Sequence, residues 1–208
     1  MKLYYVPGAC SLAPHIILEE MGIPYTAQKL SFEDDSLNRP EYSKINPMHA
    51  VPALALQDGT VITETSAIMQ YIAEQKPSTN LVPRAGTIER TKQQQYLNFV
   101  TSELHPTFGL LWSAETFVKD EKARVDFTNN VKQKIADRLE VFNNWLNGKT
   151  YLMGEQFTVA DAYAFTVISW SKYVDVKIDR YSNIPGYLSR VAERPAVLRT
   201  LKNEGLIK

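Results

Sequence analysis

The sequence predicts a two-domain chain, with an α/β domain first and an all-helical domain after it. Residues 3–30 show a strand pattern, a helical pattern and a second strand pattern, and parallel strands joined through a helix are typical of an α/β unit. Asp58-Gly59 between two apolar runs indicates a β-hairpin. Strand patterns stop after the stretch rich in Pro and Gly that follows, and long helical periodicity takes over. We therefore expect an α/β domain over residues 1–80 and an all-α domain over residues 87–208.

Each element has its own signal in the sequence. Leu3 to Tyr5 fits a strand that Pro7-Gly8 breaks, and a helix is expected from Ser11 to Gly22. Further strands are expected over residues 24–30, 53–56 and 61–63. Further helices are expected over residues 40–45, 65–76, 87–118, 121–146 and 158–170, with two short helices around Pro185 and Pro195. Pro52 could take a cis bond, but the general frequency of about 5% favours trans.

The composition excludes several classes of partner. Lys plus Arg and Asp plus Glu both number 23 in 208 residues, so no net charge attracts nucleic acid or an anionic membrane. No stretch approaches the ~20 apolar residues of a membrane span, and the N-terminus lacks a signal-peptide pattern, so we expect a cytoplasmic protein with no membrane partner. The three histidines and the single cysteine lack ligand spacing, and we expect no metal site.

Cys10 is the only cysteine, and it lies where a strand pattern turns into a helical one. It cannot form an internal disulfide, which leaves it free for a mixed disulfide with a small molecule. Unpaired N–H groups and the positive end of a helix dipole would lower its pKa, although a lone cysteine is more often a small buried hydrophobe. The position before a helix favours the reactive interpretation. Ser11 is either a helix N-cap or a hydroxyl donor to a bound sulfur.

Two other helix starts carry polar groups. At Glu64-Thr65-Ser66, N–H and hydroxyl donors could hold a ligand carboxylate while Glu64 accepts from a ligand ammonium. The structural alternative, in which Thr65 or Ser66 caps the helix and Glu64 complements its dipole, fits this stretch equally well. Thr158 and Asp161 form a capping pattern ahead of an apolar helix, so Asp161 is expected to be structural.

Taken together, these residues resemble the cytosolic glutathione transferases, and the match to the bacterial beta class is close. The resemblance covers the whole chain, and the order and spacing of its motifs make it specific. Its carriers are residues 2–12 around Cys10, Asn46-Pro47 with Val51-Pro52, Glu64-Thr65 with Ala67-Ile68, Ser102-Glu103-Leu104-His105, residues 157–163 and Glu204-Gly205-Leu206.

The resemblance implies a thioredoxin-like N-terminal domain, an all-helical C-terminal domain, and a homodimer with a glutathione site in each subunit. Glutathione would be the co-substrate and small apolar electrophiles the second substrate, with no metal. The implied catalytic groups are Cys10, His105, Ser11 and Tyr5. The implied glutathione contacts, some from the partner subunit, are Cys10, Ala50, Val51, a cis Pro52, Glu64, Thr65, Asn98, Ser102, Glu103, Leu104 and His105. The implied electrophile pocket is lined by Tyr5, Phe108, Leu111, Trp112 and Trp170.

The chain departs from the family pattern at three places. Glu33-Asp34-Asp35 stands where lysines are usual, Met48-His49-Ala50 replaces Lys-Gly-Gln, and Pro106 replaces the lysine after the site histidine. Weaker binding of the glycine end of glutathione is therefore expected. The function indicated is detoxifying conjugation of glutathione to apolar electrophiles, with thiol–disulfide exchange or peroxidase activity through Cys10. The alternative is a non-catalytic binding protein with the same fold.

Overall fold

The computed structural model describes residues 1–208 without a gap. Its contacts divide the chain into two units, one comprising Met1–Pro83 with Val191–Lys208 and the other Arg84–Arg190. The predicted second domain covers residues 87–208, whereas the C-terminal segment Val191–Lys208 belongs with the first unit. The physical reason is that α10 (Pro195–Asn203) packs against α1 (Leu12–Met21).

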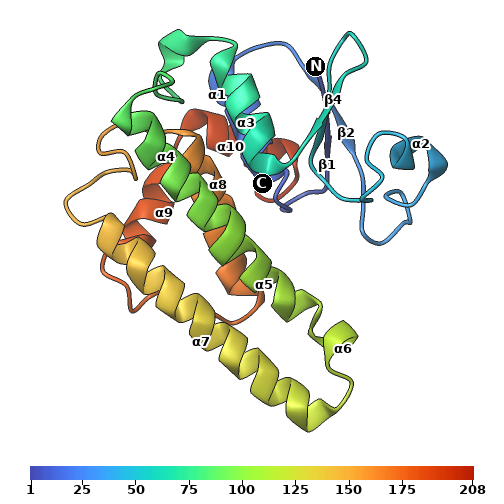
Figure 1. Cartoon of the computed structure of the whole chain (residues 1–208), viewed down its shortest axis with the longest axis vertical. Coiled ribbons are helices and arrows are strands. Elements are labelled where there is room, and N and C mark those ends of the chain that lie inside the picture. The colour runs from blue at the N-terminus through green and yellow to red at the C-terminus, as the bar shows by residue number, and fades with distance from the viewer. The chain divides into compact units, whose positions relative to one another are not determined.

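The first unit is built on a four-stranded sheet in the order β2-β1-β3-β4 (Figure 1). The strands are β1 (Lys2–Tyr5), β2 (Thr26–Lys29), β3 (Ala53–Ala55) and β4 (Val61–Thr63). β1 runs parallel to β2 and antiparallel to β3, and β3 pairs antiparallel with β4. In register, Leu3 lies opposite Ala27 on one side and Leu54 on the other. This mixed sheet confirms the predicted βαβ unit followed by a hairpin.

Helices lie on both sides of this sheet. α1 packs against α3 (Thr65–Glu74), and Figure 1 shows both on the side of the strands away from α2 (Pro40–Ser43). On the α2 side, Tyr42 packs against Tyr4 with ring centroids 5.4 Å apart, within a small apolar cluster. A 3₁₀ turn, η1 (Pro77–Thr79), follows α3.

The second unit is all-helical, as predicted. Its elements are α4 (Ile88–Phe99), η2 (Val100–Leu104), α5 (His105–Trp112), α6 (Ala114–Phe117), α7 (Glu121–Trp145), α8 (Val159–Ser169), η3 (Trp170–Tyr173) and α9 (Ile184–Ala192), which ends just past the division. Within the unit, α4 packs against α8 and α5 against α7. No helix of the chain has both the length and the apolar character needed to cross a bilayer.

The prediction of one continuous helix over residues 87–118 was wrong. The π-helical turn η2 interrupts it, and α5 then begins with His105 and Pro106. Proline has no N–H for the preceding turn, so the regular hydrogen-bond ladder cannot continue through it. Turns of this kind are rare and occur frequently at functional sites. The break places the segment Ser102 to His105 at an irregular point of the helical unit.

The capping pattern at the start of α8 is confirmed. The Thr158 N–H and hydroxyl donate to Asp161 Oδ2 at 2.9 and 3.0 Å, and Asp161 Oδ1 accepts from the Leu152 N–H at 2.9 Å. The Tyr187 hydroxyl donates to Oδ1 at 3.2 Å. Asp161 is fully buried, and burial raises its pKa to about 6 even though these donors act to lower it. The carboxylate therefore ties three segments of the unit together.

Candidate functional site

Cys10 lies in a tight turn between β1 and α1. The Ala9 N–H donates to the Val6 carbonyl at 3.1 Å, and the Leu12 N–H donates to the Ala9 carbonyl at 3.0 Å. These bonds place Cys10 two residues ahead of the first residue of α1, as the sequence predicted. The thiol donates to the Val51 carbonyl oxygen at 3.1 Å, so the turn and the segment before β3 meet at the sulfur.

The expectation of a lowered Cys10 pKa was wrong. Burial raises the pKa of the thiol to about 11, against hydrogen bonds from the Thr65 hydroxyl and the N–H groups of Cys10 and Ser11, which act to lower it; the charge of Glu64 raises it further. The donors at the helix start do act to lower the pKa, but the cost of removing a thiolate from water outweighs them. At neutral pH the resting thiol is therefore protonated and available as a hydrogen-bond donor.

Ser11 neither caps α1 nor offers a free donor to a bound sulfur. Its fully buried hydroxyl donates to the Val6 carbonyl and accepts from the Val6 N–H, both at 3.1 Å, and no side-chain cap bond forms. These two bonds join the end of β1 to the start of α1. The role that the structure gives to Ser11 is to hold the Cys10 turn in shape.

Tyr5 is buried at the end of β1. Its ring packs against the imidazole of His15 with centroids 5.2 Å apart. Burial, and then the nearby Glu204 carboxylate, raise the Tyr5 pKa. The phenol therefore keeps its proton, and the ring contacts the core of the first unit.

The segment before β3 presents backbone polar groups. The Val51–Pro52 peptide bond is cis, as the resemblance implied and against the general frequency. The Ala50 carbonyl is already used, because it accepts from the Tyr42 hydroxyl at 2.6 Å and from Asn46 Nδ2 at 2.7 Å. The Val51 carbonyl accepts from the Cys10 thiol, which leaves the Val51 N–H as the candidate to pair with an extended peptide.

The start of α3 favours the ligand interpretation over the capping one. Glu64 is exposed, makes no side-chain cap bond, and has a left-handed backbone with φ 69° and ψ 119°. A residue other than glycine in this region costs of order 1–3 kcal/mol, and such strain clusters at ligand sites. Thr65 is buried, with its hydroxyl directed to Cys10. Glu64 and Thr65 thus adjoin the thiol within one unit.

The acidic loop that replaces the expected lysines is internally bonded. Asp34 accepts from the Ser36 N–H at 3.0 Å, and Asp35 accepts from Asn38 Nδ2 at 2.6 Å. The Ser36 side chain and then the Ser36 N–H lower the Asp34 pKa. Asp35 has a left-handed φ of 59°. His49 lies in the segment Met48-His49-Ala50, which replaces the usual Lys-Gly-Gln. Its backbone is also left-handed, with φ 54°, and its Nδ1 lies 3.0 Å from the Leu37 carbonyl oxygen.

In the helical unit, His105 is surrounded by aromatic rings. Its Nδ1 lies 2.7 Å from the Tyr163 hydroxyl, and its ring packs edge-on against Trp170 with centroids 5.0 Å apart. Burial lowers the His105 pKa, so the imidazole is neutral at neutral pH. Tyr163 was not among the predicted site residues, although it is the last residue of the segment 157–163 that carries the family resemblance.

The predicted electrophile residues of this unit form one group. Trp170 packs edge-on against Phe108 and Trp112, with centroids 6.2 and 5.2 Å apart. Phe108 is fully buried, whereas Trp112 is 52% exposed and Leu111 is half-buried. An exposed tryptophan backed by buried rings is suited to an apolar ligand.

The remaining predicted glutathione contacts lie around η2. Ser102 and Asn98 are both exposed, and the Ser102 hydroxyl donates to the Asn98 carbonyl at 2.7 Å. Glu103 accepts from Arg138 Nε at 3.1 Å. The Leu104 side chain is fully buried and packs inside the unit. No three His, Cys, Asp or Glu side chains gather as metal ligands anywhere in the chain.

This geometry defines a class of protein. A cysteine at the start of the first helix of a thioredoxin-like unit, beside a cis-proline, is an arrangement suited to handling a thiol ligand. A helical unit with an aromatic group follows it in the chain.

Comparison with known proteins identifies the family. Residues 8–75 match the glutathione S-transferase N-terminal domain, and residues 110–195 match the C-terminal domain. The chain is 38% identical to glutathione S-transferase GstA of Escherichia coli O157:H7 over 99% of this chain and 100% of that protein. It is 31% identical to glutathione S-transferase GST-4.5 of Xanthomonas campestris pv. campestris, with the same coverage.

Solved structures agree. A bacterial beta class glutathione S-transferase from Sphingomonas chungbukensis has a TM-score of 0.88 and 37% identity, covering 100% of each chain. A sphingomonad glutathione S-transferase complexed with glutathione has a TM-score of 0.89 and 35% identity, also covering 100% of each chain. The chain therefore belongs to the glutathione S-transferase family and is an enzyme of that family.

Proposed function

We propose that this transferase conjugates glutathione to small apolar electrophiles, with the protonated Cys10 thiol as a hydrogen-bond donor to the glutathione thiolate. The observation that carries the proposal is the position of Sγ beside the Thr65 hydroxyl and the start of α1, together with a pKa of about 11. A group that stays protonated at neutral pH can donate to a developing or resting anion. Donation requires only that the thiol turn from the Val51 carbonyl to the incoming sulfur.

Thiol–disulfide exchange or peroxidase activity through Cys10 is the second candidate. Attack by Cys10 on oxidised glutathione would form the Cys10–glutathione disulfide and release one glutathione thiolate, which balances the reaction. The raised pKa disfavours it, because only the thiolate attacks. We therefore place exchange below conjugation.

The other residues take roles in the same proposal. Glu64 and Thr65 would bind the γ-glutamyl end and Val51 the peptide backbone of glutathione. Asn98 and the segment Ser102 to His105 would contribute further contacts, some of them across a homodimer. The electrophile would lie against Phe108, Leu111, Trp112 and Trp170. The unpaired Cys10 suits a reducing compartment, which supports a cytoplasmic location.

A turnover screen tests this proposal. Glutathione is paired in turn with aryl halides, hydroperoxides and mixed disulfides, and retention on immobilised glutathione is measured in parallel. We expect the protein to be retained on immobilised glutathione. Among the three substrate classes, we expect turnover to be greatest with the aryl halides. Retention without any turnover would support a non-catalytic binding protein, and activity confined to the disulfides would favour exchange.

Dimerisation has its own test. We expect light scattering to give twice the mass of the 208-residue chain, because some implied site contacts come from a partner subunit. An active species with the mass of one chain would contradict the proposed dimer.

Glu33→Lys should strengthen glutathione binding by a few-fold at low salt, because it turns a repulsion of the glycine carboxylate into an attraction at an exposed position. Asp35 is unsuitable for this test because its left-handed backbone and its bond to Asn38 would both be disturbed. Calorimetric titration at low and high salt measures the gain, which should shrink as salt screens the charges.

The matched control is Asp126→Lys, which makes the same change of charge at an exposed position on α7. We expect no gain from it. Equal gains in both variants would mean that overall charge, and not the loop, governs the affinity.

A further inference from the structure

Two buried side chains hold the backbone of the segment that precedes β3. The Tyr42 hydroxyl donates to the Ala50 carbonyl oxygen at 2.6 Å, and Asn46 Nδ2 donates to the same oxygen at 2.7 Å. Tyr42 is 3% exposed and Asn46 is 4% exposed, so water competes little for either bond. A carbonyl oxygen has two lone pairs, and both lone pairs of Ala50 are therefore in use.

Both donors are fixed in direction. Burial raises the pKa of Tyr42 to about 12, so the phenol keeps its proton at neutral pH and can donate it. The Tyr42 ring is held against Tyr4, with ring centroids 5.4 Å apart. Asn46 Oδ1 accepts from the Met48 N–H at 3.0 Å, which leaves Nδ2 to face Ala50. The amide cannot turn over without losing both of its bonds.

The Ala50 carbonyl and the Val51 N–H belong to the same peptide unit. This unit is trans, so its C=O and N–H lie in one plane and point in opposite directions. With the carbonyl directed at Tyr42 and Asn46, the Val51 N–H must point away from them. It has no acceptor within the protein, although Val51 is only 8% exposed. A donor left unpaired at a largely buried residue is costly, and a ligand acceptor would remove that cost.

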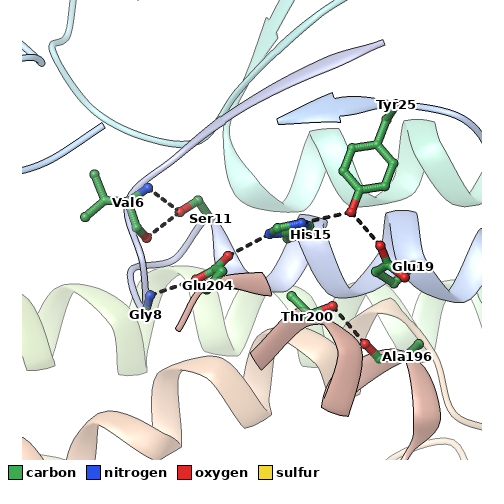
Figure 2. Close-up of polar contacts among 9 residues, drawn as sticks. All are labelled: Val6, Gly8, Ser11, His15, Glu19, Tyr25, Ala196, Thr200 and Glu204. Carbon is green, nitrogen blue, oxygen red and sulfur yellow. Dashed lines mark hydrogen bonds and ion pairs between the residues drawn. The ribbon is translucent and has the colours of Figure 1, made fainter. Parts of the chain in front are cut away.

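The turn that carries Cys10 is held by a separate set of bonds, which Figure 2 shows. The Ser11 hydroxyl bonds to both backbone polar groups of Val6 at 3.1 Å. Glu204 Oε2 accepts from the Gly8 N–H at 2.8 Å. Neither of the two side chains that hold the Ala50 carbonyl takes part in these bonds. A change at either of them therefore alters the direction of the Val51 N–H and leaves the bonds of the Cys10 turn in place.

We propose that Tyr42 and Asn46 are positioning residues for glutathione, which they do not touch. By holding the Ala50 carbonyl, they present the Val51 N–H to the cysteinyl carbonyl oxygen of glutathione, as in the pairing of an added strand. The cysteinyl residue is the one concerned because the Cys10 sulfur, which would meet the glutathione sulfur, lies 3.1 Å from the Val51 carbonyl oxygen. The inference deepens the proposed function and rests on it.

An analogue of glutathione separates positioning from a general structural defect. N-(γ-glutamyl)cysteamine carries the γ-glutamyl group and the thiol of glutathione, but it lacks the cysteinyl carbonyl and the glycine. It can therefore make no bond from that carbonyl to the Val51 N–H. A defect that merely loosens the site should weaken the binding of both ligands, whereas a lost orientation of the Val51 N–H should weaken glutathione alone.

The variant Tyr42→Phe keeps the ring and removes one bond to Ala50. In calorimetric titration under reductant, we expect it to bind glutathione about three- to tenfold more weakly, the range of an ordinary hydrogen bond, and the analogue as the native chain does. The KM for glutathione should rise by the same factor with kcat unchanged, because the bond is alike in the ground and transition states. The matched control is Tyr181→Phe, which removes an equally buried phenol that donates to the Ala136 carbonyl at 2.9 Å in the helical unit and should affect neither ligand.

A second variant and a signal from the native chain complete the test. Asn46→Ala removes the other bond to Ala50 and should weaken glutathione binding with the same selectivity, so it decides the question if Tyr42→Phe does not fold. In amide NMR of the native chain, the Val51 signal should move when glutathione is added and much less with the analogue.

The outcomes separate this inference from the proposed function. Glutathione binding at the native strength in the variants, or equal weakening for both ligands, would overturn the positioning role and leave the proposed function intact. An unmoved Val51 signal in a native chain that binds glutathione would overturn it as well. A native chain that binds no glutathione would instead overturn the proposed function, and this inference with it.

Discussion

Cys10 should react slowly with iodoacetamide at neutral pH, and its rate should keep rising up to about pH 11. Burial raises the pKa of the thiol to that value and outweighs the Thr65 hydroxyl and two backbone N–H groups. The rate of alkylation is proportional to the fraction of the thiol that is present as thiolate. At neutral pH that fraction is roughly two orders of magnitude smaller for a thiol with this pKa than for a free cysteine. The rate of alkylation against pH, followed by mass spectrometry, measures the midpoint.

A control variant tests the cause. Thr65→Val removes a hydroxyl that acts to lower the Cys10 pKa, so its midpoint should lie higher still. A native midpoint below the ~8.5 of a free cysteine would show that the helix start, and not burial, governs this thiol.

The second large effect is expected at Asp161. Asp161→Ala should destabilise the helical unit by roughly 3–5 kcal/mol, because it leaves the buried N–H groups of Leu152 and Thr158 without the carboxylate acceptor, while the Tyr187 hydroxyl keeps only the Asp161 backbone carbonyl at 3.3 Å. Denaturant unfolding measures the loss. The matched control is Asp120→Ala, which removes an exposed cap that accepts from the Ala123 N–H at 2.7 Å and should cost much less. Equal losses would contradict the structural role given to Asp161.

The destabilisation by Asp161→Ala should also depend on pH. The Asp161 pKa is raised from 3.8 to about 6 in the folded protein, so between these values the folded chain binds more protons than the unfolded chain. The contribution of Asp161 to stability is therefore full below about pH 4 and declines as the pH rises through about 6. The destabilisation by Asp161→Ala should be smaller above that window than below it.

Local patterns predicted most of the fold. The run Leu3 to Tyr5, the break at Pro7-Gly8 and the turn at Asp58-Gly59 each depend on near neighbours, and each gave the observed element. The capping of α8 by Thr158 and Asp161 was also predictable, because its partners are three residues apart.

What the sequence missed depends on partners distant along the chain. Gly8 and Glu204 are 196 positions apart, and no local pattern pairs them, so the return of α10 to the first unit was not foreseen. The prediction of a lowered Cys10 pKa was wrong for a related reason. The helix start is local, whereas the burial that outweighs it is produced by segments such as the one that ends at Val51.

The most direct test of the proposed chemistry compares conjugation of an aryl halide by the native chain, Cys10→Ser and Cys10→Ala. If the role of Cys10 is to donate a hydrogen bond to the glutathione thiolate, the serine hydroxyl can replace it. We expect Cys10→Ser to keep conjugation within about tenfold of the native rate, while Cys10→Ala loses more and both lose any exchange with disulfides. Loss of conjugation in Cys10→Ser as complete as in Cys10→Ala would contradict the account and assign Cys10 a covalent role.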